Sequence, residues 1–98
     1  MELIKNIEGN VCNIAVQGRL DTTTAPQLEN ELKTSLNGIT ELNFDLAELE
    51  YISSAGLRVL LSAQKVMNTQ GTMKIKNAIP EVLEVFEITG FTDILTIE

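Results

Sequence analysis

The 98-residue chain contains no histidine and only one cysteine. Histidine is the usual general base near neutral pH and the commonest metal ligand. Its absence excludes a Ser-His-Asp hydrolase and any zinc site that needs an imidazole. The single cysteine, Cys12, has no partner for an internal disulfide, and its apolar neighbours in the sequence predict a small buried hydrophobe. We therefore predict no catalytic residue and no metal site, and we do not expect an enzyme.

Basic residues are also scarce. The chain has seven lysines and arginines against fourteen aspartates and glutamates, which gives a formal net charge of −7. This balance disfavours nucleic acid or an anionic membrane surface as a direct partner. No apolar stretch approaches the roughly 18 residues of a membrane span. The N-terminus also lacks the charged and then apolar pattern of a signal peptide. We expect a cytoplasmic protein with no membrane insertion.

Glycine-rich phosphate-binding loops of the GxGxxG or GxxxxGKS/T type are absent as well, so we expect no nucleotide cofactor and no other cofactor. The segment Ser53-Ser54-Ala55-Gly56 is not the GxSxG motif of hydrolases, because no glycine stands two residues before the serine. The 44% hydrophobic content is sufficient for one compact core. We predict a single domain over residues 1–98.

Apolar periodicity predicts an α/β fold for this domain. Residues 8–10, Glu-Gly-Asn, separate two apolar-rich runs and are typical of an antiparallel hairpin. We expect a mixed sheet of four to five strands, opened by this hairpin, with about three helices packed largely on one side. The predicted strands are residues 2–7, 11–17, 41–46, 73–76 and 91–97, and the predicted helices are residues 24–36, 55–69 and 80–88.

The segment from Tyr51 to Gly56 joins an apolar run to the second predicted helix through two serines. The first N–H groups of a helix have no intrahelical acceptor, and they therefore suit either a capping hydroxyl or a phosphate. From spacing alone, Ser54 is either a simple helix cap, which is favoured, or a regulatory phosphate acceptor. Arg58 lies four residues further on, at a spacing that allows it to pair with a phosphate.

The second predicted helix divides into an apolar face and a polar arc when wound at about 100° per residue. Leu57 and Leu61 flank the polar arc, where they either pack against a neighbouring helix or form an exposed apolar edge beside Ser54. The polar arc comprises Ser54, Arg58, Ser62, Lys65 and Thr69, and the face expected toward the core comprises Ala55, Val59, Leu60, Ala63, Val66 and Met67.

The polar junction before the first predicted helix contains Asp21, Thr22 and Thr23. Asp21 is either an N-cap of that helix or a functional residue, and the residues alone leave both alternatives open. With catalysis disfavoured, regulated binding is the function that remains. If Ser54 is a phosphate acceptor, the hypothesis is that the unmodified chain binds a protein partner and that phosphate on Ser54 prevents this binding through repulsion and desolvation.

Three separated motifs carry a resemblance to a known family. They are Gly18-Arg19-Leu20-Asp21, then Phe44-Asp45-Leu46 with Tyr51-Ile52-Ser53-Ser54-Ala55-Gly56-Leu57, and finally Thr89-Gly90-Phe91. Together they resemble STAS domains, specifically the stand-alone bacterial anti-sigma factor antagonists. The resemblance implies that an anti-sigma factor, which is also a serine kinase, phosphorylates Ser54. It further implies that the unphosphorylated form binds that anti-sigma factor and releases a sigma factor, and that a phosphatase resets the system.

Two positions depart from the pattern of the family. Ser53 stands where an aspartate is common, and Ala55 stands where a second hydroxyl residue is common, so that Ser53 is a rival acceptor. Asp21 matches the acidic residue of the family near the phosphorylation site. STAS modules also serve as constitutive interaction subunits of lipid-transport ATPases and of stress-signalling scaffolds, which is the alternative function. The predicted partner-binding residues are Asp21, Thr22, Thr23, Ser53, Ser54, Gly56, Leu57, Arg58 and Leu61.

Overall fold

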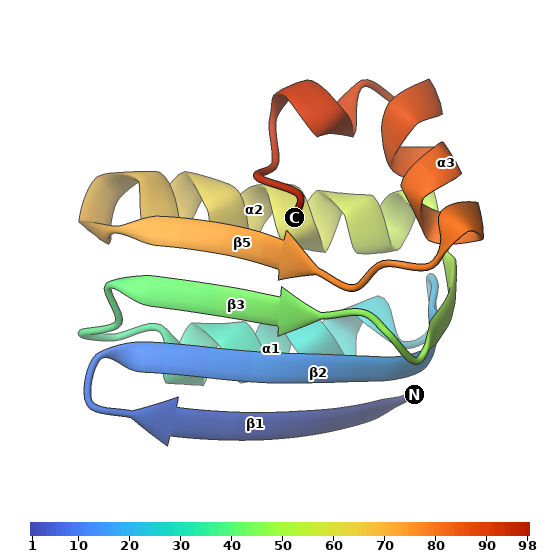
Figure 1. Ribbon diagram of the computed structural model, residues 1–98. Helices are drawn as coiled ribbons and strands as arrows, with labels where there is room; N and C mark the ends of the chain where they lie inside the picture. The colour runs from blue at the N-terminus through green and yellow to red at the C-terminus, as the bar shows by residue number, and fades with distance from the viewer.

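The computed structural model describes all 98 residues, Met1–Glu98, as a five-stranded mixed sheet with three α-helices (Figure 1). None of the helices has the length and apolar character that a membrane span needs. In chain order the elements are β1 (Glu2–Glu8), β2 (Val11–Leu20), α1 (Ala25–Ser35), β3 (Glu41–Asp45), β4 (Leu49–Ile52), α2 (Ser54–Gln70), β5 (Thr72–Lys76), α3 (Pro80–Ile88) and a 3-10 turn η1 (Phe91–Asp93).

The strands lie in the order β1-β2-β3-β5, and β4 pairs with the far end of β2. The pair β1–β2 is antiparallel, which confirms the predicted hairpin, whereas β2–β3 and β3–β5 are parallel. Gly9 allows the tight hairpin turn because its φ of +60° falls in the left-handed region that favours glycine. Figure 1 shows α1 and α2 together on one face of the sheet, with α3 beyond the carboxyl ends of the parallel strands. The mixed sheet and its three helices confirm the predicted fold class.

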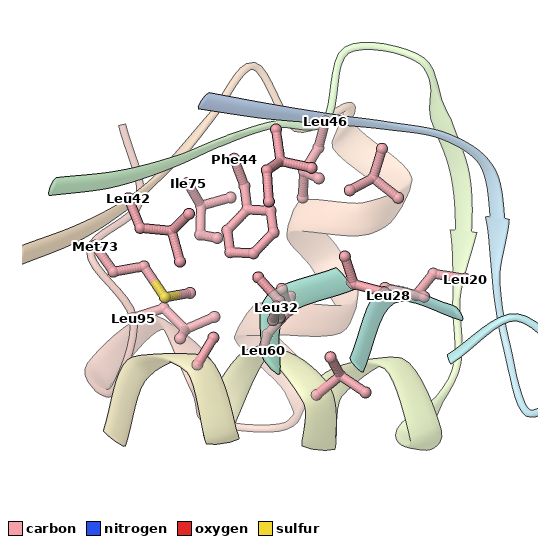
Figure 2. Packing of buried hydrophobic residues seen from close by; sticks show 14 of the residues in the cluster. Leu20, Leu28, Leu32, Leu42, Phe44, Leu46, Leu60, Met73, Ile75 and Leu95 are labelled. Atoms are coloured by element: carbon pink, nitrogen blue, oxygen red, sulfur yellow. The ribbon is translucent and has the colours of Figure 1, made fainter. Parts of the chain in front are cut away.

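A single core fills the space between the sheet and the helices (Figure 2). It forms because alternate residues of each strand point to the same face, so that Leu42 and Phe44 of β3 meet the apolar stripes of the helices. Leu28 of α1 and Leu60 of α2 are completely buried in this cluster, and α3 joins it through Phe86. Burial of these side chains positions the ends of β2, β4 and α2 relative to one another.

The prediction of a regular strand over residues 91–97 is wrong. Gly90 takes a left-handed φ of +78°, and the chain then forms the turn η1, in which the amide of Leu95 donates to the carbonyl of Phe91. Because these hydrogen bonds are local, most of the segment has no strand partner. Only Ile97 forms a bridge, with Ile75 of β5. Leu95 is nevertheless buried, so the segment closes the core without extending the sheet.

Two smaller differences concern β4 and Val66. No strand is predicted between residues 46 and 73, but Leu49–Ile52 form the short strand β4. The expectation that Val66 faces the core is also wrong, since this side chain is 42% exposed and lines an open groove between α1 and α2. It lies at the edge of the predicted apolar face, where the two helices leave the surface uncovered.

Candidate functional site

Strand β4 brings two distant segments of the chain together. It runs parallel to the end of β2, with Arg19 opposite Tyr51 and Leu20 opposite Ile52. The amide of Ser53 then donates to the carbonyl of Leu20 at 2.9 Å. The loop that follows β2 and the junction that follows β4 therefore lie side by side at the carboxyl ends of parallel strands, which is where α/β sheets commonly place functional sites.

The two serines at this junction have different environments. Ser53 is the N-cap residue of α2, with an extended backbone, and its Oγ is buried without a hydrogen-bond partner. Ser54 is the first residue of α2 and is exposed. Neither hydroxyl makes a capping hydrogen bond, so the interpretation of Ser54 as a simple helix cap is not supported.

The amino end of α2 presents free backbone donors next to Ser54. The first helical hydrogen bond runs from the amide of Leu57 to the carbonyl of Ser53 at 3.0 Å. The amides of Ser54, Ala55 and Gly56 precede this bond and have no helical acceptor. With the positive end of the helix dipole, they make an environment that stabilises a phosphate attached to Ser54.

Gly56 and Leu57 lie beneath the surface of the site. A Cβ atom at Gly56 would stand 2.7 Å from Cγ of Leu20 and 2.9 Å from Cγ1 of Ile52, so the absent side chain lets α2 approach the ends of β2 and β4 closely. Leu57 is buried in the core, so it packs inside the protein and does not form an exposed apolar edge beside Ser54. Leu61 is half-buried. Gly56 and Leu57 thus support the site from the protein interior, whereas the side chain of Arg58 is exposed at its surface.

Asp21 holds the loop between β2 and α1 in place. Its Oδ1 accepts hydrogen bonds from the hydroxyl of Thr23 at 2.7 Å, the amide of Thr23 at 3.0 Å and the amide of Thr24 at 3.2 Å. The N-cap position of α1 belongs to Thr24, whose own hydroxyl donates to the carbonyl of Arg19 at 2.8 Å. Asp21 therefore secures the turn before the helix, and Thr22 and Thr23 are left exposed at the surface.

The hydrogen bonds to Asp21 give folding a pH dependence that a substitution can reveal. The hydrogen bond from the Thr23 hydroxyl is the main cause that lowers the pKa of Asp21 below its ordinary value. A lowered pKa in the folded state contributes stability above the unfolded pKa of about 3.9, and this contribution is lost as the pH falls through the folded pKa. We expect Asp21→Asn to unfold at lower urea concentration than the wild type at pH 7, with the difference shrinking below about pH 4. A difference that stays constant down to pH 2.5 would contradict this role of the carboxylate.

Sequence reasoning missed a contact between Arg19 and Tyr51. The guanidinium of Arg19 lies 4.2 Å from the centroid of the Tyr51 ring, and its Nε lies 3.7 Å from Oδ2 of Asp21. Tyr51 is 42% exposed and flanks the junction that carries the serines. Tyrosine and arginine are enriched at the energetic centres of protein interfaces. The contact exists because the pairing of β2 with β4 places Arg19 opposite Tyr51. The sequence does not predict it, because it does not predict β4.

The chain is similar to known proteins over most of its length. The family model of the STAS domain matches residues 2–98. The protein BtrV of Bordetella bronchiseptica is 43% identical over 84 residues, which cover 84% of this chain and 72% of BtrV. The anti-sigma-B factor antagonist of Listeria monocytogenes is 33% identical over 98 residues, covering 97% of this chain and 85% of that protein.

Solved structures show the same fold. The anti-sigma factor antagonist SpoIIAA in its unphosphorylated form has a TM-score of 0.77 at 16% identity, covering 99% of this chain and 87% of SpoIIAA. The Bacillus SpoIIAA in its phosphorylated form also has a TM-score of 0.77, at 17% identity, covering 99% of this chain and 91% of SpoIIAA. The family match over nearly the whole length and the shared fold agree with the three sequence motifs, and the chain belongs to the STAS domain family.

Proposed function

We propose that the chain is an anti-sigma factor antagonist controlled by phosphorylation of Ser54. In the unphosphorylated state it binds an anti-sigma factor that is also a serine kinase, and a sigma factor is thereby released. A phosphatase restores this state after phosphorylation. The proposal is supported by the Listeria relative, which is an anti-sigma-B factor antagonist, and by SpoIIAA, which has been solved in unphosphorylated and phosphorylated forms. The chain itself acts as a binding protein and not as an enzyme.

The single observation that carries the choice of residue is the difference in accessibility between the two serines. A kinase must reach the acceptor hydroxyl, and Ser54 is exposed at the start of α2. The Oγ of Ser53 is buried, so a kinase would first have to pull this residue out of its position at the end of β4. These environments favour Ser54 over its rival.

The proposed switch acts on the partner and leaves the fold intact. A phosphate on Ser54 adds about −1.5 to −2 charges at neutral pH, together with strong acceptor oxygens. The free amides of α2 and the nearby Arg58 accommodate that charge within the chain. A partner surface that fits a neutral hydroxyl would instead have to desolvate the phosphate and meet its negative charge.

Phosphate mapping tests the proposed acceptor. The chain is incubated with ATP and a kinase-fold protein encoded next to its gene, and the modified residue is identified by mass spectrometry. We expect label on Ser54 in the wild type and in Ser53→Ala, and no label in Ser54→Ala. Label on Ser53 alone would show that Ser53, and not Ser54, is the phosphate acceptor. The absence of label on both serines would favour a constitutive STAS interaction subunit.

A further inference from the structure

Helix α2 carries uncompensated positive charge on a strongly acidic chain. Its 17 residues contain Arg58 and Lys65 but no aspartate or glutamate, while the whole chain has a net charge of −7. Both side chains are exposed, and neither takes part in any of the four ion pairs of the structure. They lie on the polar arc that begins at Ser54, which we call the α2 stripe: Ser54, Arg58, Ser62, Lys65 and Thr69.

An apolar groove runs beside the α2 stripe. It lies between α1 and α2 and has a volume of about 460 Å³. Ser62 belongs to both the stripe and the lining of the groove, so the two surfaces are continuous. Its apolar lining is formed by Leu32 of α1, by Leu36 directly after that helix, and by Val59, Ala63 and Val66 of α2.

The opposite wall of the groove contributes no free charge of its own. Lys33 of α1 lines the groove but lies 3.3 Å from Glu29, with which it forms an ion pair along the same helix. The charge that a partner would meet on this surface therefore comes from Arg58 and Lys65. Complementarity requires negative charge on the partner opposite the stripe and an apolar side chain opposite the groove.

We propose that the anti-sigma factor docks along the α2 stripe and the adjoining groove, through an acidic segment that inserts an apolar side chain next to Val66. This inference rests on the proposed function and names the chemistry of the partner surface. Val66 lies twelve residues after Ser54, or about 18 Å along the helix at 1.5 Å per residue. A standard interface covers about 800 Å² on each partner, which is enough to include both positions.

The same surface explains why one phosphate has a large effect on binding. Arg58 is one helical turn from Ser54, about 6 Å along the axis, whereas Lys65 is about 16 Å away. The Debye length at physiological salt is about 8 Å, so a phosphate on Ser54 compensates Arg58 and leaves Lys65 largely unaffected. Phosphorylation thus neutralises the positive charge of Arg58, which lies beside the acceptor. The charge of Lys65 still attracts the partner during association.

Charge reversal at Lys65 tests the docking surface, with Lys76→Glu as the matched control. Both substitutions change the net charge from −7 to −9, and Lys76 forms no ion pair but lines a pocket on the sheet face that lacks helices. Binding of the purified anti-sigma factor is measured by surface plasmon resonance at low and high salt. We expect Lys65→Glu to weaken binding about tenfold at low salt, mainly through a slower association rate, with a smaller effect at high salt. Lys76→Glu should stay within about threefold of wild type, as expected for a charge change outside the interface.

A second pair of variants tests the groove. Val66→Ser should weaken binding about fivefold through faster dissociation, because it removes apolar contact area. The control is Ile88→Ser on α3, which removes a side chain that is 76% exposed and should leave binding unchanged. If wild-type protein binds and Lys65→Glu matches Lys76→Glu, the docking surface is wrong while the proposed function stands. If wild-type protein does not bind the anti-sigma factor, the proposed function itself fails.

Discussion

Ser54→Asp is expected to weaken binding to the anti-sigma factor by at least about 100-fold. A carboxylate at this position places a negative charge where the partner fits a neutral hydroxyl. Unfavourable charge contacts across an interface cost several kcal/mol, and each 1.4 kcal/mol corresponds to about a tenfold change in Kd. The folded chain itself should tolerate the substitution, because an acidic residue in the first turn of α2 interacts favourably with the helix dipole, by about 0.3–1 kcal/mol.

The matched control for this prediction is Ser54→Asn, which has nearly the size of aspartate without its charge. We expect Ser54→Asn to bind within about threefold of wild type, and urea unfolding should show all three proteins to be similarly stable. Both affinities can be measured by isothermal titration calorimetry against the same anti-sigma factor preparation. Equal binding by Ser54→Asp and Ser54→Asn would show that charge at this residue does not control the interaction.

Gly71→Ala is expected to cause the largest loss of stability among small substitutions of the glycines. Gly71 ends α2, and its backbone is extended, with φ at 172°, so the backbone conformation alone would permit alanine. A Cβ atom there would, however, stand 1.8 Å from the carbonyl oxygen of Thr40 and 2.6 Å from its carbonyl carbon. These atoms belong to the backbone that starts β3, where the Thr40 carbonyl accepts a hydrogen bond from Thr72 at 2.9 Å. The chain must separate α2 from this segment to relieve the clash.

We expect Gly71→Ala to reduce the free energy of unfolding by about 3 kcal/mol, at the upper end for overpacked positions. The control is Gly38→Ala, where a Cβ has no neighbour within 4 Å and only the left-handed φ of +80° opposes the substitution. This variant should lose about 1–2 kcal/mol. Urea unfolding monitored by circular dichroism measures both values. A smaller loss for Gly71→Ala than for Gly38→Ala would contradict the packing described at the end of α2.

The sequence predicted those elements whose signals are local. The Glu8-Gly9-Asn10 link identified the hairpin, and the periodicity of α2 was long enough to place the helix within one residue at each end. Strand β4 was missed because it has four residues and exists only through pairing with β2, more than twenty-five residues earlier. The strand expected over residues 91–97 failed because a left-handed Gly90 starts a local turn there.

In the candidate site, too, features with local sequence signals could be predicted, whereas features that depend on long-range pairing could not. Ser54 and Arg58 could be proposed from their spacing on a helix, and the resemblance to STAS domains favoured a functional role for Asp21 over a simple cap. The burial of the Ser53 hydroxyl could not be predicted, because it depends on how β4 delivers this residue against Leu20. The contact of Arg19 with Tyr51 depends on the same strand pairing. Properties that arise from long-range register therefore required the structure.

The most direct test of the central claim compares one protein in two states. The chain is phosphorylated by its kinase, the label on Ser54 is verified, and the modified and unmodified forms are titrated into the anti-sigma factor by calorimetry. We expect tight binding of the unmodified form and an affinity at least about 100-fold lower for the phosphorylated form, as for several kcal/mol of repulsion. Treatment with a phosphatase should restore binding. Equal affinity of the two forms would contradict the proposal that Ser54 is a switch.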